Sequence, residues 1–306
     1  MITTTQAASA LIQLTVCCAG LASAQSLVDT IKIDEGRPLG MAVVQLNERY
    51  RYMVTYEDVP PDLDSEVLTT VHPPNAFHAD EVHARAPKTG PVTFRVTRPS
   101  KMKPGEPDVA LVVHAEVASA AEDLVTQYNA SGNPGQFKVI DDGKYVHVVP
   151  FERKVRGKIR PFEPVFDTRV TITPDEESKM PCMQALNNLF FKTYEARNIS
   201  VVLGMVSMNS LFSTECQVSG ANVKAREVLK SILEQMTVYG LDPRNRPTDS
   251  FAWSLVYDVN FDAYFFSTVL IPLRDPLVGL PSASPAPPRP KAPGSRIFLP
   301  PEKQDH

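Results

Sequence analysis

Three histidines gather in one short segment of this 306-residue chain, and they are the residues best suited to chemistry. In the run HPPNAFHADEVHARAP, His72, His78 and His83 lie close to Asp80 and Glu81. Imidazoles and carboxylates are common zinc and copper ligands, so a metal-binding or enzymatic role for this segment is one hypothesis. The spacing lacks the HExxH register that places two imidazoles on one helical face, and two prolines open the run. A polar loop without a metal is therefore the main expectation.

Other catalytic and cofactor motifs are missing from the sequence. It contains no GxSxG nucleophile motif, no GxGxxG or Walker spacing, and no cysteine close to an activating base. Glycines such as Gly143 fit tight turns instead. We expect no catalytic residue and no cofactor.

The N-terminus has the features of an export signal. The first 24 residues carry no charge, and residues 11–21 are apolar but too few to span a bilayer. Small residues precede Gln25, which predicts cleavage after Ala24 and a periplasmic or secreted protein. Since no Lys or Arg precedes Lys32, a buried N-terminal helix is the alternative. No later segment is long and apolar enough to predict an integral membrane helix in the mature chain.

Removal of this leader would leave two cysteines, Cys182 and Cys216, in an oxidising compartment. We predict that they form a disulfide, which would close a loop of just over thirty residues and stabilise the fold by about 3–4 kcal/mol. Two buried free thiols are the alternative.

Composition indicates a globular protein of two domains. The chain has 43% apolar residues and a net charge of −4, which disfavours nucleic-acid binding. Residues 151–165 are predicted to be a solvated basic linker, with a membrane-surface or nucleic-acid patch as the alternative. The linker's cations are Arg153, Lys154, Arg156, Lys158 and Arg160. Residues 272–306 contain ten prolines, a composition typical of a disordered tail.

Hydrophobic periodicity predicts the same order of elements twice, in domains covering residues 25–150 and 166–271. In each, a β-α-β unit precedes a β-α-β-β unit. The first contains helices near 38–50 and 117–128 and a hairpin over 137–149, and the second contains helices near 181–194 and 228–236 and a hairpin over 253–270. The prediction is a duplicated α+β fold with small mixed sheets and helices packed on one face. Coincidence is the alternative, because helices and strands alternate in many α+β domains.

Two segments carry a resemblance to a known family. RPLGMAVVQLNERYRYMVTY resembles the short N-terminal (STN) domain of secretins and TonB-dependent transducers, and FKVIDDGKYVHVVP is similar to the ring-building modules of secretins. The resemblance covers most of residues 29–150 and returns more weakly over 166–271. A secretin would continue into a large membrane-inserted region, whereas this chain continues into a proline-rich tail, so we expect a free-standing relative.

In those families the modules mediate contacts between envelope proteins, and the resemblance implies the same role here. We therefore expect a non-catalytic, extracytoplasmic module that binds an envelope protein. Recognition of a cell-wall polymer or peptide is a third hypothesis, because Trp253, Tyr264, Phe265 and Phe266 could line a groove, although aromatic residues in hairpins are usually core.

Overall fold

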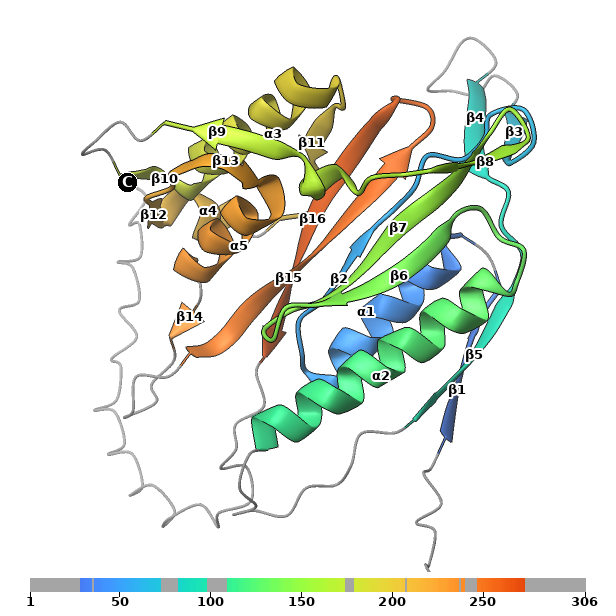
Figure 1. Ribbon diagram of the computed structural model, residues 1–306, viewed down its shortest axis with the longest axis horizontal. Coiled ribbons are helices and arrows are strands. Elements are labelled where there is room, and N and C mark those ends of the chain that lie inside the picture. Colours follow the sequence, from blue (N-terminus) through green and yellow to red (C-terminus); the bar gives the residue numbers. More distant parts are fainter. Residues whose placement is uncertain are drawn as a thin grey trace, which may run out of the picture.

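The structure is a computed structural model that describes residues 28–34, 36–72, 82–97, 109–173, 179–206, 208–236, 238–239 and 247–272. Within these ranges, one mixed sheet and four two-stranded ribbons are combined with helices (Figure 1). The predicted α+β fold class is confirmed. The predicted signal peptide, His78 and the proline-rich tail lie outside the described residues.

Each half contains the predicted β-α-β and β-α-β-β units. In the first half these are β1 (Val28–Ile33), α1 (Pro38–Tyr50), β2 (Val54–Glu57), β5 (Val92–Thr97), α2 (Val109–Asn129), β6 (Gln136–Asp141) and β7 (Val146–Val155). In the second half they are β9 (Arg169–Ile172), α3 (Cys182–Arg197), β11 (Val201–Leu203), β13 (Gly220–Lys224), α5 (Ala225–Gln235), β15 (Pro247–Asp258) and β16 (Ala263–Pro272).

Shorter elements lie between these units. They are β3 (Val67–His72), β4 (Val82–Pro87), β8 (Lys158–Pro161), the 3-10 helix η1 (Val165–Asp167), β10 (Met180–Pro181), α4 (Met208–Ser213), β12 (Glu215–Cys216) and β14 (Val238–Tyr239).

The strand pairing repeats between the halves. In the first half β1 pairs antiparallel with β5, β2 runs parallel to β7, and β6 completes a hairpin with β7. In the second half β9 pairs antiparallel with β13, β11 runs parallel to β16, and β15 completes a hairpin with β16. The duplication predicted from periodicity is therefore present in the topology.

The two halves share one sheet, which the sequence left undecided. The order is β11-β16-β15-β2-β7-β6, and the halves meet where β15 runs parallel to β2. Figure 1 shows α1 and α2 towards one end of this sheet and α3 and α5 towards the other.

The helices of the two halves cover opposite faces of the shared sheet. Val54 and Tyr56 on β2 belong to the core formed with α1 and α2, whereas the next residue, Glu57, contacts Arg226 on α5. Successive residues of a strand point to opposite faces, so α5 lies across the sheet from α1 and α2. The expectation of helices on one face holds within each half but not across the whole sheet.

Helix α1 shows how the sequence builds one of these layers. Pro38 occupies its first turn, where the missing N–H costs nothing, and Arg51 in the left-handed conformation ends it. Buried Asn47 bonds both the N–H and the C=O of Val54, which ties the helix to β2. A Cβ at Gly40 would lie 3.0 Å from the Tyr56 ring, so glycine allows this close approach.

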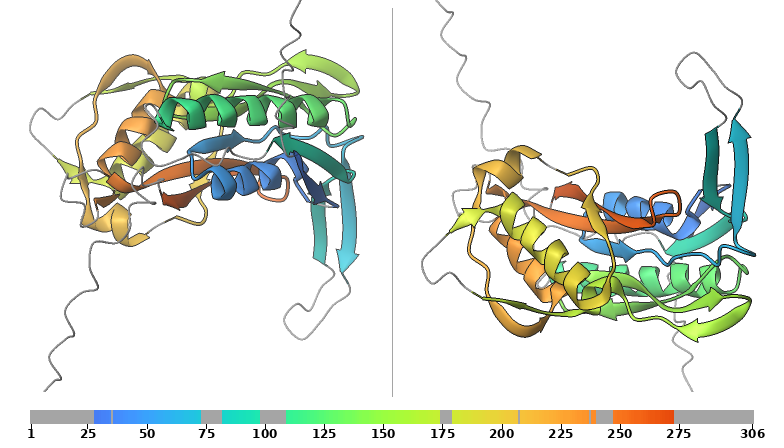
Figure 2. Two further views of the ribbon diagram at one scale, coloured as in Figure 1. Left: turned by 90° about the horizontal axis from the view of Figure 1, so that it is seen from below. Right: turned by 90° about the horizontal axis from the view of Figure 1, so that it is seen from above.

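Two segments differ from the sequence prediction. Residues 151–161, expected as a linker, continue strand β7 and turn back through β8, with Arg153 paired to Arg160. The histidine run, expected to be a polar loop, lies within the hairpin β3–β4 where the structure describes it, and this hairpin projects from the rest of the molecule in Figure 2. In both segments the charge and proline content concealed strands that form hairpins.

In the part of the chain that the structure describes, no helix has the length and apolar character needed to cross a membrane.

A disulfide joins Cys182 at the start of α3 to Cys216 on β12, as predicted, and their Cα atoms lie 4.9 Å apart. Both residues are buried, and the ribbon β10–β12 aligns Cys216 with Met180. The bond therefore fastens the start of α3 to the chain that leads into α5.

Reduction of this disulfide should lower the free energy of unfolding by about 3 kcal/mol, because the unfolded chain regains loop entropy. Urea denaturation with and without dithiothreitol measures the effect. The variant Cys182→Ala/Cys216→Ala should be as unstable as the reduced protein and should not respond to dithiothreitol. An identical midpoint for oxidised and reduced wild type would contradict this role.

Candidate functional site

The histidine segment falls on the hairpin β3–β4. His72 is paired with Val82 and His83 with Val71, so the two histidines are not partners in register. His78 lies outside the described residues. Among the residues that the structure describes, no group of three or more His, Cys, Asp or Glu side chains could hold a metal ion.

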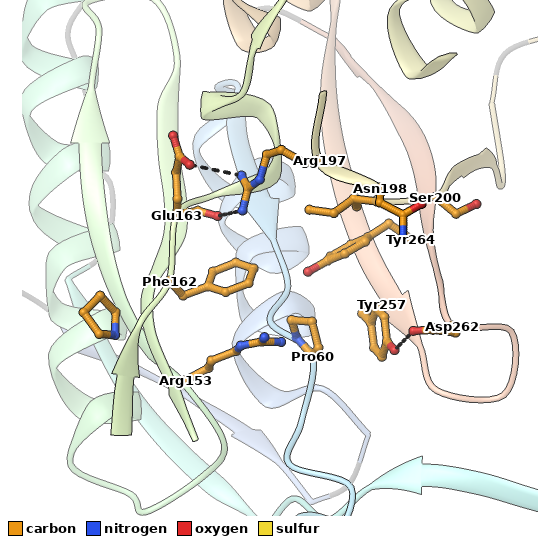
Figure 3. Close-up of a pocket in the computed structure, with 12 residues that line it drawn as sticks. Pro60, Arg153, Phe162, Glu163, Arg197, Asn198, Ser200, Tyr257, Asp262 and Tyr264 are labelled. Carbon is orange, nitrogen blue, oxygen red and sulfur yellow. Dashed lines mark hydrogen bonds and ion pairs between the residues drawn. The ribbon is translucent and has the colours of Figure 1, made fainter. Parts of the chain in front are cut away.

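The main candidate site is a cleft of about 540 Å³ between the two halves. It opens at the carboxyl ends of the parallel strands β2, β7 and β15, next to the end of α3 (Figure 3). This volume is in the range of pockets that hold small molecules or a few peptide residues. The first half contributes Pro60, Arg153, Pro161, Phe162 and Glu163; the second contributes Arg197, Asn198, Ile199, Ser200, Tyr257, Asp262 and Tyr264.

Arg153 comes from the segment predicted to be a linker. Its guanidinium stacks on the Phe162 ring, 5.3 Å from the centroid, and forms no hydrogen bond or ion pair with any described residue. The sequence signal for this residue was the basic run, whose position beside a cleft could not be read from the sequence.

Two tyrosines of the β15–β16 hairpin line the cleft. In Figure 3 the Tyr264 ring reaches across it, whereas the Tyr257 hydroxyl points towards Asp262. Tyr257 donates its hydroxyl hydrogen to Asp262. Burial raises the pKa of Tyr257 above its usual range, and the bond to Asp262 adds to the effect. Tyr264 is only 3% exposed, its hydroxyl has no hydrogen-bond partner among the described residues, and burial raises its pKa well above the usual value. Both phenols therefore stay protonated at neutral pH and act as donors.

Arg197 is held by the protein itself. It donates to the carbonyl oxygens of Pro164, at 3.0 Å, and Glu163, at 3.1 Å, and its guanidinium lies 3.5 Å from the Glu163 carboxylate. These bonds fix the end of α3 against the chain after β8. Arg197 shapes the cleft but has fewer donors left for a ligand than Arg153.

A buried ion pair joins the halves at the same strand end. Arg226 on α5 lies 2.6 Å from the Glu57 carboxylate and 3.0 Å from Asp167, with Glu57 and Arg226 almost fully buried. Glu57 also accepts from the Phe166 N–H. Burial raises the pKa of Glu57, although Arg226 and the backbone donors act to lower it.

A second polar cluster lies at the opposite end of β7. His147 is buried against Trp253, with ring centroids 5.2 Å apart. Because a carboxylate only accepts, the imidazole donates from Nε2 to Asp142 and accepts at Nδ1 from Thr55. Burial lowers the pKa of His147, against the opposing effect of Asp142. Burial acts to raise the pKa of Asp142, but bonds from His147 and Lys230 hold it well below its usual value.

A groove of about 360 Å³ runs beside the edge strand β11 and shares Ser200 with the cleft. Phe191 and Tyr194 on α3 line it and are 57% and 48% exposed. Val202 on β11 is also exposed. Clustered exposed aromatic side chains of this kind are typical of protein-binding surfaces.

The aromatic residues named from the sequence have different positions. Trp253 and Phe266 are buried in the second-half core, as hairpin aromatics usually are, whereas Tyr264 reaches the cleft. The donors in the cleft, a guanidinium and phenols, are suited to binding anionic or polar groups.

Comparison of the chain with protein-family models, curated proteins and solved structures gave no match in any of the three. The relation to STN domains and secretin modules remains a prediction.

Arg226→Met should reduce the free energy of unfolding by about 3–5 kcal/mol, because it leaves the Glu57 carboxylate buried without a partner. Lys224→Met is the matched control, since Lys224 pairs with Asp167 at a partly exposed position and should cost less than about 1 kcal/mol. Urea denaturation compares the two. Equal losses would show that the buried pair does not brace the halves.

Stability should fall as the pH drops below about 6.5, because the unfolded chain then binds a proton that buried His147 resists. The loss between pH 7.5 and pH 5.5 should be about 1 kcal/mol for this group. His147→Gln should flatten the dependence, because it removes the group that resists protonation in the folded state. Urea denaturation midpoints at both pH values measure the loss of stability. The same pH dependence in wild type and His147→Gln would refute this role of His147.

Proposed function

We propose that this protein is exported and acts as a non-catalytic module that binds another protein of the bacterial envelope, with the edge of β11 as its contact. The observation that supports this proposal is a comparison of the two halves of the protein. In the first half, the strand equivalent to β11 is β2, and its edge is already occupied by an added strand, β15.

The β2–β15 junction shows what such an edge accepts. Ser254 and Leu255 lie beside Tyr56 and Glu57 in parallel register, and the Asp58 N–H donates to the Leu255 carbonyl at 2.7 Å. Strand addition thus supplies main-chain hydrogen bonds, with side chains on both faces providing selectivity.

The edge of β11 has the same outward geometry, and none of the described strands pairs with this outer edge. The Ser200 carbonyl accepts from Tyr264, and the Gly204 N–H donates to Phe266, so even-numbered residues bond inward to β16. The N–H and C=O groups of Val201 and Leu203 therefore point outward. Among the described strands, β11 ends the sheet order, and an unpaired edge is a template for another chain.

The groove beside this edge would receive the partner's side chains. Phe191 and Tyr194 project from α3 over the position that an added strand would occupy. Large aromatic side chains contribute much of the binding energy at protein interfaces.

Two features support export. The uncharged leader of residues 1–24 predicts cleavage, and the disulfide Cys182–Cys216 is the kind of bond that persists in oxidising compartments. The resemblance to envelope modules agrees with both.

Capture from envelope extracts tests the proposal. Residues 25–306 are immobilised, and a captured protein is purified and titrated against the variants Phe191→Ala/Tyr194→Ala and Leu203→Pro. Each variant should weaken binding at least tenfold, because one removes exposed aromatic contacts and the other removes an outward N–H donor. The double alanine variant should melt as wild type does, since both rings are largely exposed.

Ile159→Ala provides the control, because Ile159 is an exposed apolar residue on β8 outside the groove. It should bind as wild type does. Binding that is unchanged in the groove variants, or weakened equally in Ile159→Ala, would reject β11 as the contact.

A further inference from the structure

The cleft contains a cation whose donors bind none of the described residues. Arg153 is positioned by the β7–β8 hairpin and by its stacking on Phe162, and its guanidinium has no hydrogen-bond or ion-pair partner among the described residues. A guanidinium at such a site matches the two oxygens of a carboxylate or a phosphate group.

A buried hydroxyl lies opposite this cation. The Tyr264 hydroxyl is out of contact with solvent and has no hydrogen-bond partner among the described residues. Figure 3 shows the ring reaching from β16 across the cleft towards Phe162 and Arg153. An unpartnered buried hydroxyl destabilises the fold, and Tyr264 lines the same cleft as Arg153, so a ligand that accepts from both would satisfy it.

The charged side chains that line the cleft indicate whether a carboxylate or a phosphate fits it better. Asp262 accepts from Tyr257, and the Glu163 carboxylate lies beside Arg197, so two carboxylates also line the cleft. With Arg153 and Arg197 they make the lining neutral overall. A singly charged carboxylate is compatible with this setting, whereas a doubly charged phosphate would meet repulsion from both acids.

Apolar side chains also line the cleft beside these polar groups. Pro60, Pro161 and Phe162 are among them. An apolar group attached to the carboxylate would pack there, and the volume of about 540 Å³ accommodates more than one residue.

We propose that the cleft binds the terminal carboxylate of a peptide whose last side chain is apolar, with Arg153 and the Tyr264 hydroxyl as the two donors. The cleft and the β11 groove share Ser200, but neither Arg153 nor Tyr264 lines the groove, so either proposal can fail without the other. Strand addition at β11 depends on main-chain bonds, whereas this site depends on one anion.

Calorimetric titration with N-acetylphenylalanine tests the proposal on residues 25–306 at pH 7. The free acid should bind at least tenfold more tightly than N-acetylphenylalaninamide, because only the acid provides a charged acceptor. Acetate tests for a site for free small carboxylates, and inorganic phosphate tests for a phosphate site. Both should bind at least tenfold more weakly than N-acetylphenylalanine.

The variants separate binding from folding. Arg153→Met should weaken binding of N-acetylphenylalanine about tenfold or more, while Lys158→Met, which removes the same charge from the same basic segment outside the cleft, should not. Tyr264→Phe should weaken binding and at the same time leave the melting temperature unchanged or raise it, since it removes a hydroxyl without a partner.

Several results would overturn the assignment. Equal binding of acid and amide would exclude a carboxylate site, and equal or tighter binding of acetate or phosphate would exclude a peptide terminus. A clear drop in melting temperature for Tyr264→Phe would show that the hydroxyl serves the fold and not a ligand.

Discussion

The parallel pairing of β15 with β2 is the contact on which the rest of this structure depends. It joins the strands of two similar halves into one sheet and brings Glu57 under Arg226 of the other half. A buried carboxylate without that arginine would be strongly unfavourable, so the pair tolerates little change in the relative position of the halves. The junction between the halves therefore depends on main-chain bonds and on one buried ion pair.

The two halves repeat the same strand order, but they differ in whether the edge of their outer parallel strand is paired. Each half contributes three strands to the shared sheet. At one side of each set of three lies a strand that runs parallel to its neighbour within the half, β2 in the first half and β11 in the second. The first of these edges is filled by β15, whereas the second has no strand beside it in the described part of the chain. Helix α3 packs beside β11 as α1 packs beside β2, so α3 supplies the exposed aromatic side chains of the groove at the open edge.

The cleft arises from the same junction, since parallel β2, β7 and β15 end together beside the last turn of α3. Its polar groups fall into two kinds. Arg197 and Glu163 bond to the protein around them, as do Tyr257 and Asp262. Arg153 and the Tyr264 hydroxyl have no such bonds among the described residues, whereas the nearby Glu57 carboxylate accepts from Arg226 and from the Phe166 N–H.

Periodicity and turn residues in the sequence were sufficient to predict α1, α2, α3 and α5, the repeated element order, the hairpin at Gly143 and the pairing of Cys182 with Cys216, because these depend on local patterns or on a count of two cysteines. Local patterns could not reveal that Arg153 faces a cleft, that Tyr264 reaches the same cleft while Trp253 is core, or that β15 adds to β2. Those features join residues up to about two hundred positions apart, and only tertiary packing decides which buried or basic side chains meet there.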